Sequence, residues 1–305
     1  MLKTPVLFVI FNRYDTALQV FKAIQEIKPE KLYVSADGPR KNNPEDYKKC
    51  KKTREIINLI DWECELHTNF LDENLGCHIA LPHAINWFFE HNDMGIILED
   101  DCLPSDSFFS FCETMLNHYR NDNRIMHITG NNFLDGKIKL DGSYYFSNLP
   151  LIWGWATWKR AWDYYDINFS TFPKFKKQNQ IKNIFKDWLV QLGIMYNYDK
   201  IFSKRGVAWD FAWSYAVYCQ NGLCITPSEN LITNLGFGEG AVHCHNKNDR
   251  YSKLKRHEIE IEEIKHPDFV IPQKEADLYT LRNHNKYNIV EITKKIFKNV
   301  TNTKF

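Results

Sequence analysis

The chain has 305 residues, of which 44% are hydrophobic and 15% aromatic, enough for the core of one large domain or two closely packed halves. Its 39 basic and 38 acidic residues leave a net charge of +1, which gives no reason to expect a nucleic-acid partner. The eight cysteines form no CxxC pair and no zinc-type spacing, so they indicate reduced, packed thiols in a cytoplasmic protein rather than a disulfide network.

The apolar run near the N-terminus, "PVLFVIF" at 5–11, has the length of a strand and lacks the small-residue cleavage site of a signal peptide. No apolar segment approaches the ~20 residues that a transmembrane helix needs. We therefore expect contact with a membrane to be peripheral at most.

The first hundred residues alternate between strand-like and helix-like segments. Strands are predicted at 5–11, 31–39, 64–70 and 94–100, with helices between them at 15–27, 43–60 and 79–91. Asp15 is the expected N-cap of the first helix, and Pro82 is expected in the first turn of the third. This order predicts an α/β fold with a doubly wound, mostly parallel sheet, whose ligands bind beyond the carboxyl ends of the strands.

After residue 105 the alternation weakens. A helix is predicted at 105–120 and a strand at 125–130, followed by an aromatic-rich stretch at 144–162. Further helices at 173–204 lead to a Gly-rich loop at 234–245 and a polar tail. Within the tail, the basic, mildly amphipathic segment 291–300 suits either an ordinary surface helix or docking at a membrane surface.

Three consecutive carboxylates, Glu99, Asp100 and Asp101, stand at the end of the fourth predicted strand. Helix capping does not require them, because Ser105 or Asp106 can cap the next helix. In extended chain Glu99 and Asp101 share a face, which suits a hard divalent cation that also binds a diphosphate. The first strand is followed by neither a Walker motif nor GxGxxG, which excludes ordinary ATPases and dehydrogenases.

The motifs "VLFVIFNR", "YVSADG", "ILEDD", "GWATWKRAW" and "VAWDFAWSYAV" occur in this order along the chain. Together they resemble the metal-dependent glycosyltransferases of the GT-A fold, and most closely the N-acetylglucosaminyltransferase I family and its bacterial relatives, over residues 4–245. The resemblance implies a nucleotide-sugar-binding half at 1–105 and an acceptor-binding, catalytic half at 106–250 packed against it. Residues 251–305 would form a polar tail with a short helix.

The resemblance implies roles for three residues near the nucleotide. Arg13 would contact the nucleotide, Asp37 would hydrogen-bond the uracil, and His78 would lie near the same base. Each has a simpler interpretation: Arg13 as a surface arginine, Asp37 as a turn residue that supports Gly38, and His78 as a partly buried polar group in a first helical turn.

The resemblance also implies the roles of the catalytic and metal-binding carboxylates. Asp101 would hold Mn²⁺ or Mg²⁺, while Glu99 and Asp100 would lie against the donor sugar and ribose. Asp210 in "AWDFAW" matches the catalytic base of enzymes that invert the anomeric centre, although it could also be the N-cap of its helix.

Further residues are candidates for sugar recognition. Trp153 or Trp155 could form the floor of a sugar site, with Gly154 allowing close backbone approach, although both indoles could also be core. Asn131 and Asn132 follow a predicted strand and could hydrogen-bond sugar hydroxyls.

Near the C-terminal loop, His243 and His245 flank Cys244 and would share one face of an extended segment. Since some GT-A enzymes close the metal site with a C-terminal histidine, His243 is the candidate second metal ligand and His245 its alternative. Zinc binding by this trio is conceivable, but no other ligand cluster in the sequence supports it.

These expectations describe a metal-dependent, inverting glycosyltransferase. It would move a sugar from a UDP-sugar, such as UDP-GlcNAc or a related hexose donor, to a hydroxyl of a glycan or lipid-linked glycan in surface polysaccharide synthesis. It would act in the cytoplasm or at the inner face of the membrane.

Two other classes remain as alternatives. A sugar-nucleotide nucleotidyltransferase would want a Gly-rich basic loop after the first strand, where "FNRYDTA" stands. A non-catalytic carbohydrate-binding protein would need neither the carboxylate triplet nor Asp210.

Overall fold

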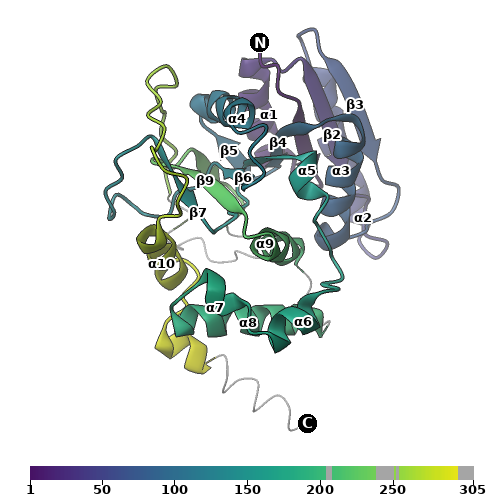
Figure 1. Ribbon diagram of the computed structural model, residues 1–305. Helices are drawn as coiled ribbons and strands as arrows, with labels where there is room; N and C mark the ends of the chain where they lie inside the picture. Colours follow the sequence, from purple (N-terminus) through teal and green to yellow (C-terminus); the bar gives the residue numbers. More distant parts are fainter. Residues whose placement is uncertain (204–207, 238–250, 252–253, 295–305) are drawn as a thin grey trace.

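The computed structural model describes residues 1–203, 208–237, 251 and 254–294, and its centre is an eight-stranded sheet covered by helices on both faces (Figure 1). The strands lie in the order β3-β2-β1-β4-β8-β6-β9-β7. The first four are mutually parallel, and β8 and β7 run antiparallel to their neighbours. The fold is therefore a mixed α/β, Rossmann-like one with a mostly parallel sheet, as the sequence predicts.

The alternating elements of the first hundred residues are confirmed. The strands are β1 (Val6–Ile10), β2 (Lys31–Ala36), β3 (Glu65–Phe70) and β4 (Met94–Glu99). The helices are α1 (Tyr14–Ile27), α2 (Pro44–Arg54), which continues as the 3₁₀ helix η1 (Glu55–Leu59), and α3 (Cys77–His91).

The continuous apolar run of β1 follows from burial on both faces. Val6 and Phe8 pack into the core beneath α1, together with Phe21, whereas Leu7 packs with Phe88 of α3 on the opposite face. Two separate cores thus fix the strand and hold its carboxyl end at one edge of the molecule.

Two helix starts differ from the sequence prediction. Arg13 is the N-cap of α1 and Asp15 lies in its first turn, so the assignment of Asp15 as N-cap is wrong. Helix α3 begins at Cys77 because the carbonyl of Gly76 accepts hydrogen bonds from the amides of Ile79 and Ala80. Pro82 therefore lies inside the helix rather than in its first turn.

After β4, the chain adds four strands to the same sheet and two to a small separate one. Its elements are β5 (Cys102–Pro104), α4 (Asp106–His118), β6 (Ile125–Thr129), β7 (Tyr144–Ser147), β8 (Trp155–Trp158), α5 (Lys159–Trp162), β9 (Leu223–Pro227) and β10 (Ile232–Asn234). Strand β8 inserts between β4 and β6, while β5 and β10 form a two-stranded antiparallel sheet.

Within the aromatic-rich stretch, Trp158 is the last residue of β8 and Trp162 the last residue of α5, which starts directly after β8.

The remaining helices lie on one side of the sheet: α6 (Phe172–Lys177), α7 (Ile181–Ile184), α8 (Trp188–Phe202), α9 (Trp209–Cys219) and α10 (Lys274–Asn283). Figure 1 shows α9 between the sheet and the helices α6 to α8. Trp213 of α9 packs in the same core as Phe88, and Tyr215 packs with Tyr198 of α8 in a third core. Burial on both sides therefore fixes the first turn of α9 near the sheet.

The C-terminal region is also anchored to the sheet. The amide of Gln273 donates to the carbonyl of Phe146 in β7, and Asp277 of α10 accepts hydrogen bonds from the Ser147 hydroxyl and the Asn148 amide. Of the predicted helix at 291–300, only residues 291–294 are described. In the described part of the chain, no helix is long and apolar enough to cross a bilayer.

Candidate functional site

The carboxylates that follow β4 are bound to an arginine that follows β1. Arg13 forms ion pairs with both Asp100 and Asp101, and the distance from its Nη1 to Asp101 Oδ2 is 3.0 Å. The Asp100 carboxylate also accepts a hydrogen bond from the Phe11 amide at 3.3 Å. Because β1 and β4 are paired in register, their carboxyl ends bring these groups together.

Burial and mutual repulsion set the ionisation of this cluster. Burial raises the pKa of Asp100 to about 6, since it outweighs the opposing charge of Arg13. Burial, and then the charges of Asp101 and Asp100, raise the pKa of Glu99 well above its usual range. Burial by itself would lower the pKa of Arg13. The negative charges of Asp100 and Asp101 outweigh the effect of burial, so the pKa of Arg13 is raised. The site thus concentrates negative charge that a cation would relieve.

Three cavities lie in a row along the carboxyl edge of the sheet, and each shares lining residues with the next. The strand-end cavity, of about 410 Å³, lies at the ends of β1, β2 and β4. The carboxylate cavity, of about 350 Å³, shares Arg13, Cys77 and Glu99 with it. The inner cavity, of about 210 Å³, shares Trp153 and Asp210 with the carboxylate cavity.

Asp37 lines the strand-end cavity, but both of its carboxylate oxygens already have partners. They accept hydrogen bonds from the amides of Gly38, Leu75 and Gly76 and from the side chain of Asn74. The turn-supporting role considered from the sequence is therefore present. Contact between Asp37 and a nucleotide base stays a prediction.

A second polar cluster in the strand-end cavity was not foreseen. Asp46 of α2 is 1% exposed and binds Arg40, whose Nη2 donates to it at 2.9 Å, and Asn12, whose Nδ2 donates at 2.8 Å. Lys49 lines the same cavity. The sequence offers little sign of this cluster, because Asp46 stands among the many charged residues of α2.

The carboxylate cavity gathers residues from distant parts of the chain. His78, in the first turn of α3, Glu99, Asp101 and Asp210 all line it. Asp210 lies in the first turn of α9, whose N-cap is Ala208, so the N-cap interpretation of Asp210 is wrong.

The segment after β10 begins the Gly-rich loop predicted at 234–245, and it contacts Asp101 through residues that the sequence analysis did not single out. The Leu235 amide donates to the carbonyl of Asp101, and the Gly236 amide donates to Asn234 Oδ1 at 2.7 Å. A Cβ atom at Gly236 would overlap Asp101 Oδ2. The only available signal was the glycine-rich composition of "NLGFGEG".

The two tryptophans proposed for sugar binding differ in their exposure and surroundings. Trp153 is partly exposed and lines two cavities, whereas Trp155 is 1% exposed and stacks on His127 in the core. The assignment of Trp155 to a sugar site is therefore wrong, because its position in β8 buries it. Gly154 has φ +60°, and a Cβ there would lie 2.5 Å from Ile232, so it serves core packing rather than ligand approach.

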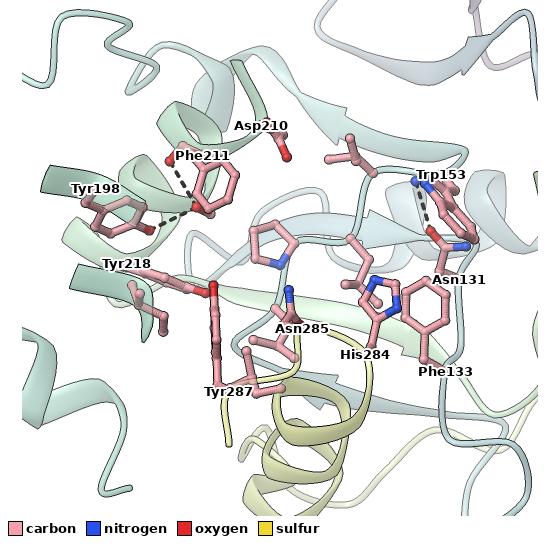
Figure 2. A pocket seen from close by; sticks show the side chains of 17 residues that line it. Asn131, Phe133, Trp153, Tyr198, Asp210, Phe211, Tyr218, His284, Asn285 and Tyr287 are labelled. Carbon is pink, nitrogen blue, oxygen red and sulfur yellow. Dashed lines mark hydrogen bonds between the residues drawn. The ribbon is translucent and has the colours of Figure 1, made fainter. Parts of the chain in front are cut away.

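The two asparagines after β6 have structural partners. Asn132 is buried and donates to the carbonyls of Pro227 and Ser228. Asn131 is fully buried, and its Oδ1 accepts a hydrogen bond from the Trp153 amide at 2.9 Å. Asn131 thus positions the backbone of Trp153 at the inner cavity (Figure 2).

The donor set of the carboxylate cavity fits a hard cation in part. Glu99 and Asp101 offer carboxylate oxygens, the ligand type that Mg²⁺ and Mn²⁺ prefer, and Asn234 lies beside them. Within the described residues, no group of three or more histidine, cysteine, aspartate or glutamate side chains forms a complete metal site. His243 and His245, predicted as further ligands, lie outside the described residues.

Comparisons with known proteins give partial likenesses. No family model matches the chain, and no curated protein matches it significantly. HddC from Yersinia pseudotuberculosis is a similar solved structure, with 12% identity over 37% of this chain and a TM-score of 0.27; the match spans 55% of HddC. A UDP-glucose pyrophosphorylase complexed with UDP-glucose has 14% identity over 54% of this chain and 79% of its own, with a TM-score of 0.31. No property of either protein follows for this chain from likenesses of this size.

Proposed function

We propose that this protein is a glycosyltransferase that moves a sugar from a nucleotide-diphosphate donor, most simply a UDP-sugar, to a hydroxyl of a glycan or lipid-linked glycan. The observation that carries the proposal is the position of Asp210. This carboxylate lies on the wall shared by the carboxylate cavity and the inner cavity, so it can face a donor on one side and an acceptor on the other.

The donor would occupy the strand-end and carboxylate cavities. Its base and ribose fit the strand-end cavity beside Asp37 and Asp100, and its diphosphate would reach Arg13. His78 would stand near the donor in the carboxylate cavity. The resemblance to GT-A enzymes, noted from "ILEDD" and "AWDFAW", supports the same arrangement.

Asp101, with Glu99 beside it, would hold Mn²⁺ or Mg²⁺, and the bound cation would supply Lewis-acid stabilisation of the leaving diphosphate. Asp210 takes the proton from the acceptor hydroxyl as that oxygen forms a bond to the anomeric carbon. The bond from the anomeric carbon to the diphosphate oxygen breaks, and the nucleotide diphosphate leaves with the bonding electrons. Attack from the face opposite the leaving group inverts the anomeric centre.

The second candidate is a sugar-nucleotide nucleotidyltransferase, the alternative raised from the sequence. One of the similar solved structures is by name a pyrophosphorylase, and Arg40 and Lys49 line the strand-end cavity, where a triphosphate would need positive charge. Both candidates handle nucleotide-sugars, and they differ in the co-substrate. A glycosyltransferase consumes a UDP-sugar and an acceptor hydroxyl, whereas a nucleotidyltransferase consumes UTP and a sugar 1-phosphate.

Calorimetric titration of UDP, GDP and CDP, with Mn²⁺ and with EDTA, tests the donor site first. We expect one nucleotide to bind, and only with the metal. The enzyme is then incubated with UDP-hexoses alone and with UTP plus a hexose 1-phosphate. Slow release of UDP from one UDP-hexose supports the transferase, release of pyrophosphate supports the nucleotidyltransferase, and no metal-dependent nucleotide binding removes both.

A further inference from the structure

The inner cavity differs in charge from the two cavities that precede it, because Asp210 is the only aspartate, glutamate, lysine or arginine among the described residues that line it. Most of the other lining residues are apolar or aromatic, and they come from the chain between β6 and β8, from α8 and α9, and from the end of α10 and the residues after it (Figure 2). Pockets of this composition, with a few placed polar groups, are typical small-ligand sites. We infer that this cavity binds the terminal ring of the acceptor as a neutral sugar, an inference that rests on the proposed function.

Aromatic rings form one wall of the cavity. Trp153 packs edge-to-face on Phe133, with ring centroids 5.2 Å apart, and Phe133 stacks on His284 at 3.8 Å. Figure 2 shows these three side chains together on one side of the cavity. Because Phe133 and Asn131 hold Trp153 in place, its indole is a preorganised surface for the C–H face of a pyranose.

Hydroxyl and amide groups lie on the opposite side. The Tyr198 and Ser214 hydroxyls are 2.9 Å apart, and the Tyr287 hydroxyl accepts a hydrogen bond from Asn197 at 2.7 Å. Asn285 is exposed and lines the mouth. These neutral groups can exchange hydrogen bonds with sugar hydroxyls without a fixed charge.

Charge in the cavity argues against an acidic or phosphorylated acceptor. Asp210 places a carboxylate in the wall, and no lysine or arginine is among the described residues that line it. An anionic sugar would lose hydration beside a like charge, which is costly, whereas a neutral ring would not.

The C-terminal region completes this site rather than serving as a tail alone. His284 and Asn285 directly follow α10, and the packing of α10 on β7 through Asp277 and Ser147 fixes where they lie. Acceptor choice should therefore be sensitive to residues about 75 positions from Asp210 in the sequence.

Binding of small probes tests this inference without knowledge of the natural acceptor. Methyl glycosides of glucose, galactose and N-acetylglucosamine, and methyl glucuronide, are measured by saturation-transfer NMR with UDP and the diamagnetic cation Mg²⁺ present. We expect at least one neutral glycoside to bind and the glucuronide to bind about tenfold more weakly or not at all.

Variants of the chain test whether the glycosides bind in the inner cavity. Asn285→Trp narrows the cavity mouth from an exposed position and should weaken glycoside binding about tenfold, with UDP affinity unchanged. Asn283→Trp, also exposed but not lining the cavity, is the matched control and should bind as wild type does. Trp153→Ala should abolish binding, and Trp153→Phe should retain most of it.

Equal glycoside binding by wild type and Asn285→Trp would overturn the inference, as would glucuronide binding as tight as that of neutral sugars, or no glycoside binding to wild type. The proposed function fails separately, if UDP does not bind or no UDP-sugar is turned over. Neutral glycoside binding to a protein that ignores UDP would leave the cavity assignment intact and remove the transferase.

Discussion

The two walls of the cleft are built in different ways. On the strand-end wall, Arg13, Asp100 and Asp101 are bound to one another at the ends of buried parallel strands. On the helix wall, Asp210 stands on α9, a helix fixed by aromatic packing on both sides. The charged groups of the strand-end wall are thus already paired in the absence of a ligand. The helix wall contributes one carboxylate, that of Asp210, from a separate helix. Binding and chemistry should therefore be separable by mutation.

The largest effect expected is from Asp210→Asn. Loss of the general base should lower transfer by about 10²–10⁴-fold, while UDP–Mn²⁺ affinity changes little, since the nucleotide would lie along the other wall. Steady-state transfer rates and calorimetry on the same preparation measure the two quantities.

Asp163→Asn, at an exposed surface position, is the matched control and should behave as wild type. Loss of UDP binding in Asp210→Asn, with transfer reduced in proportion, would contradict the proposal that the strand-end wall binds the nucleotide and the helix wall supplies the base.

Asp101→Asn tests the strand-end wall. It keeps the shape of the side chain and removes a charge that would hold the cation, so metal-dependent UDP affinity should fall by about 100-fold. The Arg13 guanidinium would still have Asp100 as its partner, so thermal stability should change little. UDP binding that stays tight and metal-dependent in Asp101→Asn would place the cation elsewhere.

The strand-end wall could be predicted from the sequence because the patterns that specify it are local. Four apolar runs with helical segments between them specify parallel strands, and residues directly after such strands must meet at one edge. Glu99, Asp101 and Arg13 could be placed by that rule alone. Helix starts were less readable, since Asp15 looked like a cap and the carbonyl of Gly76 decided where α3 begins.

The helix wall and the cavities beside it could be predicted only in part, because their positions depend on pairing between distant segments of the chain. The aromatic-rich stretch at 144–162 has no pattern that marks its strands, and its segment "WATW" is strand β8 between β4 and β6, which buries Trp155 and leaves Trp153 at the cavities. Nor does any local pattern show that residues after α10 return to the inner cavity. Pairing over about 30 to 60 residues places β8, and contacts over 130 residues place α10 and the residues after it.

Gly236→Ala probes the contact between the segment after β10 and the strand-end wall. The added methyl would overlap Asp101 Oδ2 and lie 3.0 Å from Asn234 Oδ1, so the Asp101 carboxylate would have to turn. We expect UDP–Mn²⁺ affinity to fall roughly five- to tenfold with a nearly unchanged melting temperature. In a double-mutant cycle with Asp101→Asn the effects should be non-additive, because Gly236 acts through Asp101. Simple additivity would contradict this.

The last prediction concerns stability rather than activity, at a residue that belongs to neither wall. Burial raises the pKa of Asp277 to about 6, while Ser147 and the Asn148 amide stabilise its charged form only in part. The folded state thus holds a proton that the unfolded chain releases near pH 4, so this group's contribution to stability is present below about pH 4 and is lost as the pH rises through about 6. The loss is about 2–3 kcal/mol.

Asp277→Asn cannot ionise, so it should flatten this part of the profile and become more stable relative to wild type at pH 7 than at pH 4. Urea unfolding at both pH values measures the difference, with Asp268→Asn, at an exposed position, as the control. A profile for Asp277→Asn parallel to that of wild type would mean that Asp277 does not titrate in this range.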